Sequence, residues 1–335
     1  MRAYVMEGPG RGGIKDVPDP VLGDLDARVE MVVCGICSST DKMLRAGTFR
    51  GGVTYPSILG HEAVGRVVEL GPAVRHIPLG SLVTRPSAYQ PDRAPLGLYW
   101  GGFAEQGVVT DWEALREDRP DREWRPRFDQ MRFEPERDPA SIALAISLSE
   151  TFSVICRTDV LNRTVAVAGT GIAGLSFVAY ARLLGAATVV CVGRRRSRLE
   201  LAERLGADST AVADGDAPES LMEAVGRADI VFEASGQADM VGRSCRWLKP
   251  GGREVIYSAP EAEASIDLMA APRDASIIVA STHETSVMPG VVRMVEGGVI
   301  DRDLLLTHRY AFAEIKKAFD EVAQGGVVKG LVTFT

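Results

Sequence analysis

A glycine-rich loop within VAVAGTGIAGLS, residues 165–176, is the feature that most restricts how this chain can fold. Its glycines have the spacing G-x-G-x-x-G and lie between an apolar run typical of a buried strand and a helix-forming segment. This spacing permits a tight turn, a close approach of backbone amides to a diphosphate, and packing of the helix on the strand. The helix N-terminus offers unpaired N–H groups to phosphates. We predict a dinucleotide site here, the alternative being a similar turn that binds another ligand; its residues are Gly169, Gly171, Ile172, Ala173 and Gly174.

Strand-like and helix-like segments alternate from residue 141 to about residue 298, which predicts a doubly wound parallel sheet. The first 110 residues instead contain short β-like runs separated by Gly and Pro, which predict a compact all-β barrel or sandwich. A final helix and strand could return to this first domain. Residues 164–181 carry no charge, but their early glycines favour a buried strand plus helix over a membrane span.

The second predicted strand of the alternating region ends at Gly193, followed by Arg194, Arg195 and Arg196. An NAD-binding fold usually has an acid here that binds the ribose 2'-hydroxyl. Glycine leaves room for a 2'-phosphate, and guanidinium groups can bind it through paired hydrogen bonds. We predict that Gly193, Arg194 and Arg195 favour NADP(H). If the arginines only face solvent, NAD remains acceptable.

The net charge of -7 argues against nucleic acid or an anionic membrane as the main partner. Five cysteines are too few and too unevenly placed for a disulfide framework, and the N-terminal residues lack a signal-peptide pattern, so we expect a reduced, cytoplasmic setting. The segment 116–138 is rich in arginines and acids whose charges nearly cancel. It is either a solvent-exposed surface loop or a loop that binds substrate.

Cys34 and Cys37 form a C-x-x-C pair followed by hydroxyl residues and Asp41. The pair could be a redox dithiol, half of a structural zinc clip, or part of a catalytic metal site that uses one sulfur. A dithiol would require a thioredoxin-like setting, and a clip would require a second cysteine pair. Because neither is found and His61 and Glu62 follow in a Gly-rich β segment, the third interpretation is favoured.

The motifs CGIC..TD, GHEAVGRVVELG, GGFAEQGVV, the glycine loop and LKPGG run in this order through nearly the whole chain. On these motifs the chain resembles the zinc-dependent medium-chain alcohol and polyol dehydrogenases. The resemblance implies an α/β fold with a GroES-like β-barrel catalytic domain and a Rossmann cofactor domain. We place the catalytic domain at residues 1–148 and 299–335, and the Rossmann domain at residues 149–298.

The resemblance also implies the site residues. Cys37 matches the catalytic zinc cysteine, and His61 matches the imidazole ligand; Glu150, in ETFSV, matches the third ligand of the polyol branch. Glu62 resembles a glutamate that lies beside the metal and can replace its water. The remaining matches are Asp41 as the acid that orients the histidine, Thr40 or Ser39 as the proton-passing hydroxyl, and Lys329 as the residue that contacts the cofactor diphosphate.

Two departures from the family pattern change the expectation. The stretch after residue 85 lacks the four cysteines of the family's structural zinc, so we expect one zinc per chain. Met43 replaces the histidine that many relatives use for proton relay, so the proton must leave by another route.

The resemblance implies hydride transfer between a nicotinamide cofactor and a small hydroxylated substrate such as a polyol, sugar or cyclitol. The alternative is an epimerase or isomerase that oxidises its substrate transiently. We expect a homodimer or homotetramer, a packed thiol at Cys34, surface positions for His76 and His308, and either a substrate contact or an ordinary polar loop at His283 and Glu284.

Overall fold

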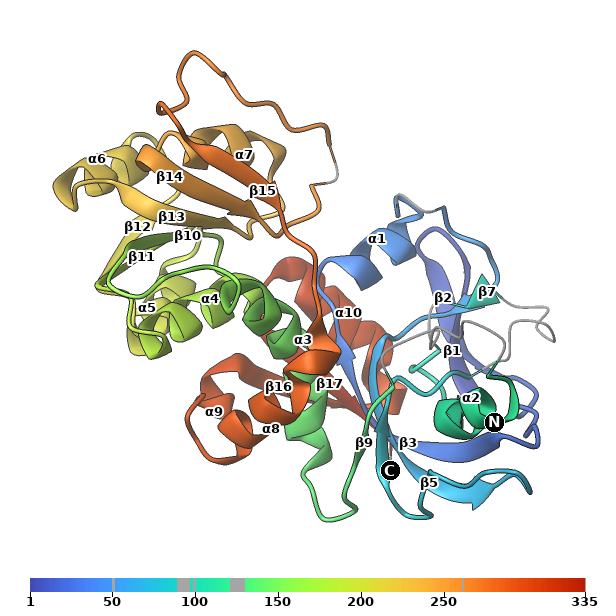
Figure 1. The fold of residues 1–335 in the computed structure, drawn as a ribbon. Helices are drawn as coiled ribbons and strands as arrows, with labels where there is room; N and C mark the ends of the chain where they lie inside the picture. Colours follow the sequence, from blue (N-terminus) through green and yellow to red (C-terminus); the bar gives the residue numbers. More distant parts are fainter. Residues whose placement is uncertain (50–51, 89–96, 99–100, 121–129, 261, 335) are drawn as a thin grey trace. The chain divides into compact units, whose positions relative to one another are not determined.

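The computed structural model describes residues 1–49, 52–88, 97–98, 101–120, 130–260 and 262–334 (Figure 1). Its contacts divide the chain into two compact units, one of Met1–Ile146 with Leu306–Thr335 and one of Ser147–Leu305. We call them the GroES-like unit and the Rossmann unit. Their boundaries lie two and seven residues from the ones placed on the sequence, and the first falls inside helix α3 (Pro139–Ile155).

The Rossmann unit is built on a six-stranded sheet with the strand order β12-β11-β10-β13-β14-β15. All neighbouring strands are parallel, and this order is that of a dinucleotide-binding doubly wound sheet. The α/β prediction from the alternating sequence pattern is therefore confirmed. The strands are β10 (Thr164–Ala168), β11 (Thr188–Gly193), β12 (Ser209–Val212), β13 (Ala228–Glu233), β14 (Leu248–Ile256) and β15 (Ser276–Val279).

Helices cover both faces of this sheet, with α4 and α5 on one side and α6 and α7 on the other (Figure 1). On the α6 and α7 side, Met222 and Met240 belong to one buried cluster with strand residues such as Val190. On the α4 side, the Phe177 ring stacks on Phe232 of β13 with centroids 4.4 Å apart. The helices are α4 (Ile172–Leu183), α5 (Arg196–Arg204), α6 (Ala217–Ala224), α7 (Ala238–Cys245), η1 (Glu284–Ser286), α8 (Met288–Glu296) and α9 (Arg302–Leu305).

The GroES-like unit contains two sheets, as the short β-like runs of its sequence predict. One has the order β2-β1-β4-β7, and the other has the order β16-β17-β3-β5-β6-β9, with β8 also paired to β3. Strand β17 pairs antiparallel with β3, so the end of the chain does return to this unit. The strands are β1 (Arg2–Gly8), β2 (Arg11–Asp16), β3 (Asp26–Ile36), β4 (Ser57–Ile58), β5 (Glu62–Leu70), β6 (Leu82–Thr84), β7 (Gly97–Leu98), β8 (Gln106–Thr110), β9 (Arg132–Phe133), β16 (Leu306–Ala311) and β17 (Lys329–Thr333); the helices are α1 (Thr40–Ala46), α2 (Trp112–Asp118), η2 (Phe312–Glu314) and α10 (Ile315–Gln324).

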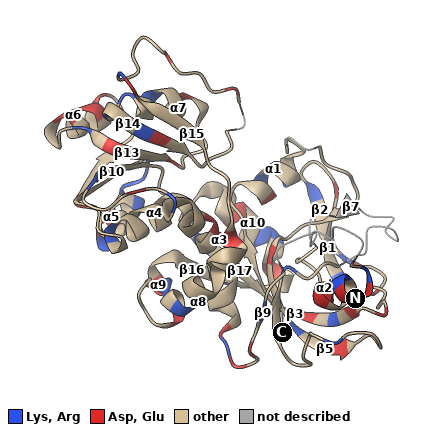
Figure 2. Cartoon of the chain, viewed as in Figure 1, with Lys and Arg blue, Asp and Glu red and all other residues tan. Residues whose placement is uncertain are grey.

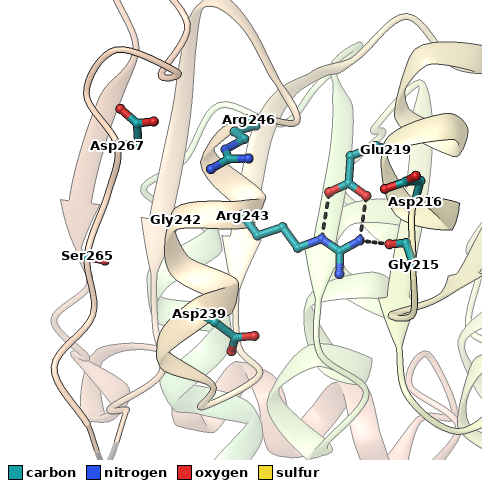
Figure 3. Close-up of a pocket in the computed structure, with 9 residues that line it drawn as sticks. All are labelled: Gly215, Asp216, Glu219, Asp239, Gly242, Arg243, Arg246, Ser265 and Asp267. Atoms are coloured by element: carbon teal, nitrogen blue, oxygen red, sulfur yellow. Dashed lines mark hydrogen bonds and ion pairs between the residues drawn. The ribbon is translucent and has the colours of Figure 1, made fainter.

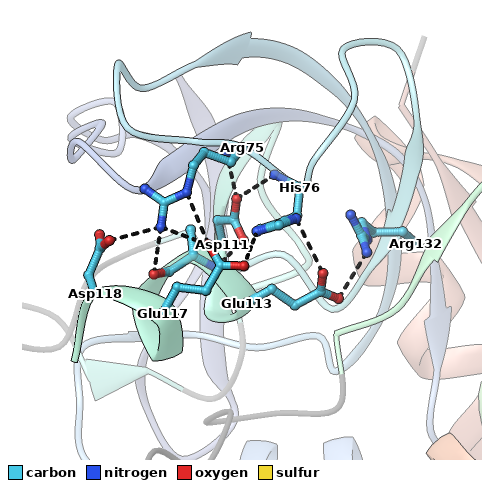
Figure 4. Close-up of polar contacts among 8 residues, drawn as sticks. Arg75, His76, Asp111, Glu113, Glu117, Asp118 and Arg132 are labelled. Atoms are coloured by element: carbon cyan, nitrogen blue, oxygen red, sulfur yellow. Dashed lines mark hydrogen bonds and ion pairs between the residues drawn. The ribbon is translucent and has the colours of Figure 1, made fainter. Parts of the chain in front are cut away.

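Asp111 caps α2 and ties it to the segment before β6 (Figure 4). Its buried carboxylate accepts hydrogen bonds from the backbone N–H groups of Ala114, Arg75 and His76. Burial raises the pKa of Asp111, but these three donors outweigh it and the pKa is lowered. The half-buried His76 ring lies 3.1 Å from Glu117, so this histidine is part of a polar network and not simply a surface residue.

Helix α2 forms part of the arginine-rich and acid-rich segment, and residues 121–129 of that segment lie outside the described residues. Over the described residues, acidic and basic residues are interspersed along the chain of both units (Figure 2). No helix of the described chain combines the length and apolar character needed to cross a membrane.

Glu254 is a fully buried acid in the core of the Rossmann unit. It lies on β14, and its Oε1 accepts a hydrogen bond of 2.5 Å from the Ser244 hydroxyl on α7. Burial, with the nearby charge of Glu233, raises the pKa of Glu254 to about 7. Because the unfolded chain ionises this acid near its ordinary pKa, Glu254 costs stability as the pH rises from about 4.5 to about 7.

We expect Glu254→Gln to raise the free energy of unfolding of this unit by about 3 kcal/mol at pH 8, since each pKa unit corresponds to roughly 1.4 kcal/mol. The gain should fall to about 1 kcal/mol at pH 5 and towards zero below about pH 4, where both states hold the proton. Urea denaturation followed by tryptophan fluorescence at pH 8 and pH 5 measures it. Glu200→Gln, on the exposed side of α5, is the matched control. Equal gains at both pH values would contradict burial of a neutral acid.

Candidate metal and cofactor sites

The pairing of β3 with β5 brings the predicted metal ligands of the GroES-like unit together. The two strands are antiparallel with Gly35 opposite Glu62, so the end of β3 lies beside the start of β5. Cys37 directly follows β3, and His61 directly precedes β5. Residues far apart in the sequence therefore meet at one end of the strand pair.

Cys37, His61 and Glu62 form a group of potential metal ligands. One ligand atom from each lies within 4.8 Å of the others. His61 and Glu62 are buried, and Cys37 is half-buried. Burial opposes protonation of His61, but Asp41 and Cys37 outweigh it and raise the pKa of the imidazole well above its ordinary value. A sulfur, an imidazole and carboxylates are also ligand types that bind a metal cation.

Asp41 lies where it can orient His61. Its carboxylate is fully buried, with Oδ1 3.5 Å from His61 Nδ1, while Oδ2 accepts a hydrogen bond of 2.9 Å from the backbone N–H of Cys37. An acid against Nδ1 leaves Nε2 as the metal-binding nitrogen. One carboxylate thus contacts two predicted ligands, in agreement with the role that the resemblance implies.

The two candidate proton-passing hydroxyls differ in their surroundings. Thr40 begins α1 and is half-buried, and its backbone N–H donates to the Cys37 Sγ at 3.4 Å. Ser39 is the exposed N-cap residue of the same helix and makes no side-chain capping bond. Met43 is buried inside α1. Thr40 therefore contacts a predicted ligand through its backbone, and which of the two hydroxyls passes a proton stays a prediction.

The other sulfur of the pair, Cys34, is packed in the core. It is fully buried, and a Cβ added to Gly102 would lie 3.0 Å from its Sγ. Burial, helped by the charges of Asp41 and Glu62, raises the pKa of the Cys34 thiol well above its ordinary value. The prediction of a packed thiol is confirmed.

Glu62 has a partner that its sequence neighbourhood does not reveal. Its Oε2 forms a close ion pair with the Lys329 ammonium, which also donates to the Ile36 carbonyl at 3.3 Å. Both side chains are buried. Gly35 makes the pair possible, because a Cβ there would lie 2.3 Å from Glu62 Oε2. Contact of Lys329 with a cofactor diphosphate stays a prediction.

Glu150 belongs to the Rossmann unit, on α3. Its Oε2 accepts a hydrogen bond of 3.0 Å from the Tyr257 hydroxyl. Its role as a metal ligand stays a prediction. Nearby on the same helix, Ser153 Oγ accepts a hydrogen bond from the backbone N–H of His283 at 2.9 Å. His283 is exposed and Glu284 is buried, and a substrate contact by either stays a prediction.

The glycine loop has the backbone that its spacing predicts. Gly169, just after β10, has a φ of 118°, which is strained for other residues. Gly171 caps α4, and Ile172 and Ala173 form its first turn. A Cβ on Gly174 would lie 1.9 Å from the Gly169 carbonyl oxygen, so the helix can pack on the loop only with glycine here. This geometry suits a diphosphate at the helix N-terminus.

Gly193 ends β11, and its backbone leaves no room for a side chain because a Cβ would lie 2.4 Å from Thr170. This contact gives a second reason for glycine, besides space for a 2'-phosphate. Arg194 and Arg195 are exposed at the start of α5. Sequence reasoning did not single out Arg198, a fourth arginine near the cofactor-binding candidates. Arg198 is buried on α5, and burial, with the charge of Arg195, lowers its pKa to about 10. Its spacing of one helical turn from Arg194 and Arg195 is the sequence signal that places it on the same side of α5.

A separate pocket lies between α6, α7 and the segment before β15 (Figure 3). Arg243 crosses it and donates to Glu219 at 2.6 and 2.7 Å, as well as to the Gly215 carbonyl. The hydrogen bond from Arg243 lowers the pKa of Glu219 to about 2. The residues lining it include none of the predicted site residues.

Comparison with known families agrees with this arrangement of two units. The alcohol dehydrogenase GroES-like domain matches residues 23–117, and the zinc-binding dehydrogenase domain matches residues 173–296. Together they define a two-domain dehydrogenase. The chain belongs to the zinc-binding medium-chain alcohol dehydrogenase family, and it is an NAD(P)-dependent oxidoreductase.

Relatives match the chain over nearly its full length. It is 26% identical to an erythritol/L-threitol dehydrogenase of Mycolicibacterium smegmatis, over 97% of this chain and 95% of the relative. It is 27% identical to an L-threonine 3-dehydrogenase of Streptomyces coelicolor, over 100% of both chains. A zinc-binding dehydrogenase of Sinorhizobium meliloti, solved bound to NADP, has 28% identity and a TM-score of 0.79, over 99% of this chain and 98% of that chain.

Proposed function

We propose that the protein transfers a hydride reversibly between NADP(H) and a secondary alcohol of a small hydroxyl-rich substrate, such as a polyol, sugar or cyclitol. The observation that carries this proposal is the group of Cys37, His61 and Glu62 beside the hydroxyl residue Thr40. The relatives named erythritol/L-threitol dehydrogenase and L-threonine 3-dehydrogenase are named for small molecules that carry hydroxyl groups, which supports the substrate class.

One zinc ion per chain fits the donor atoms of this group. A thiolate, an imidazole and a carboxylate are the ligand types of a catalytic zinc with an open position. We propose that Cys37, His61 and Glu150 are the ligands, and that Glu62 lies beside the metal, where it can take the place of its water. The buried acids around His61 supply the negative charge that a divalent cation needs.

When bound, zinc supplies a Lewis acid that lowers the pKa of a hydroxyl group, and the nicotinamide supplies the hydride acceptor. The chain's own residues orient the ligands and move the substrate proton. Asp41 holds the His61 ring in orientation through Nδ1. Thr40, or the exposed Ser39 next to it, accepts the substrate proton at its hydroxyl oxygen while its own hydroxyl proton passes outward to solvent. This route replaces the relay that Met43 cannot provide.

We expect Cys37→Ala and His61→Ala to lose both bound zinc and dehydrogenase activity, because each removes a ligand. Zinc content by mass spectrometry of the purified protein, with activity followed by nicotinamide absorbance, measures both. Cys34→Ala is the matched control, since it removes the other sulfur of the C-x-x-C pair from the core and should retain zinc. A full equivalent of zinc in either ligand variant would refute the assignment.

The cofactor preference rests on Arg194 and Arg195, which lie exposed just after β11. Removing both as Arg194→Ala with Arg195→Ala should raise the KM for NADP about 10- to 100-fold, because charge-assisted hydrogen bonds to the 2'-phosphate contribute roughly 1.5–3 kcal/mol. The KM for NAD should change little. Arg204→Ala, exposed at the far end of α5, is the control. An unchanged NADP/NAD preference in the double variant would rule out this role.

A screen of alcohols, sugars and ketones with added NADP(H) tests the reaction type. Net reduction of NADP supports a dehydrogenase, whereas isomerisation of the substrate without net turnover of cofactor would support the epimerase alternative.

A homodimer or homotetramer is also proposed. In its support, the edge strand β15 exposes Ile278 and Val279, and an exposed apolar edge favours pairing with another strand.

A further inference from the structure

Tyr257 lies at the carboxyl end of β14, an interior strand of the parallel sheet, and open parallel sheets bind their ligands at this end of the strands. It directly follows β14, and its backbone N–H donates to the Glu233 carbonyl on β13 at 2.9 Å. Its ring meets Phe177 edge-on, with centroids 5.4 Å apart and planes at 82°, and Phe177 in turn stacks on Phe232. The backbone hydrogen bond and the ring contact with Phe177 therefore both hold Tyr257 in place.

The hydroxyl of this half-buried tyrosine donates to Oε2 of Glu150 at 3.0 Å. The part of α3 that carries Glu150 belongs to the Rossmann unit and is fixed within it. Ser153 Oγ donates to the Glu150 carbonyl at 2.7 Å and accepts the backbone N–H of His283 at 2.9 Å. One turn further along, the Arg157 guanidinium donates to the Ser281 carbonyl. Both the backbone and the carboxylate of Glu150 are thus held by this unit.

We infer that Tyr257 is a positioning residue whose hydroxyl holds the Glu150 carboxylate in the orientation that serves the metal. This inference rests on the proposed function. A glutamate side chain has three rotatable bonds, and fixing them on metal binding costs conformational entropy. A hydrogen bond from a rigidly packed phenol fixes them beforehand. It engages one oxygen, and a carboxylate ligand of zinc needs only one oxygen for the metal.

A hydrogen bond from a neutral donor also leaves the carboxylate ionised and able to bind a cation. An arginine or lysine in the same place would neutralise the carboxylate and compete with the metal. Hydrogen-bond partners of metal ligands typically change metal affinity by about 10- to 100-fold when they are removed. The type of donor and its rigid packing therefore both suit a residue that orients a ligand without replacing the metal.

Tyr257→Phe tests the inference, because it deletes the hydroxyl and keeps the ring that packs on Phe177. The dissociation constant of zinc, measured by competition with a chromogenic chelator, should rise about 10- to 100-fold. The KM for NADP should stay within about twofold, as expected when the loss is confined to the metal site. Tyr310→Phe is the matched control: it deletes a phenol that donates to Glu321 at 2.6 Å in the GroES-like unit, and should leave zinc affinity unchanged.

A double-mutant cycle with Glu150→Gln separates the inference from the proposed function. If Tyr257 acts through Glu150, the double variant should bind zinc about as weakly as Glu150→Gln alone. Unchanged zinc affinity in Tyr257→Phe, beside weakened affinity in Glu150→Gln, would overturn the inference and leave the proposed metal site standing. Unchanged affinity in Glu150→Gln would overturn the ligand role of Glu150 and the inference with it. Additive losses would show that Tyr257 acts by another path.

Discussion

The antiparallel register of β3 and β5 is the constraint on which the candidate metal site depends. With Gly35 opposite Glu62, Cys37 lies beside His61 at the same end of the strand pair. A slip of one residue would send every side chain of β5 to the opposite face of the sheet. Glycine at position 35 permits this register together with the buried pair of Glu62 and Lys329, because a Cβ there would clash with Glu62 Oε2 at 2.3 Å. Local backbone geometry thus decides which side chains form the site.

The charge balance of this region explains why a divalent cation suits it. Asp41 is fully buried, and Glu62 is nearly so. Buried carboxylates are costly unless they are paired or bind a metal. Lys329 compensates Glu62, and burial of this lysine is outweighed by Glu62 and Cys37, which raise its pKa and keep it charged. Asp41 and the Cys37 sulfur remain to face His61, and zinc would complete the compensation.

Sequence reasoning predicted the parts of the molecule that depend on local patterns. The glycine loop and the alternating strands and helices follow from spacing and hydrophobicity, because these act over a few residues. The structure adds contacts between distant residues, such as Lys329 with Glu62 and Tyr257 with Glu150. A lysine in an apolar strand or a tyrosine after a strand carries no sign of its partner. Such pairs follow only from strand order and register.

The interpretation of the C-x-x-C pair as a one-sulfur metal site is the central claim, and X-ray absorption at the zinc edge tests it directly. The zinc-loaded protein should show one sulfur neighbour at about 2.3 Å and lighter nitrogen or oxygen neighbours at about 2.0–2.2 Å. That result would match Cys37 as a ligand with Cys34 in the core. Two sulfur neighbours, or none, would contradict the account.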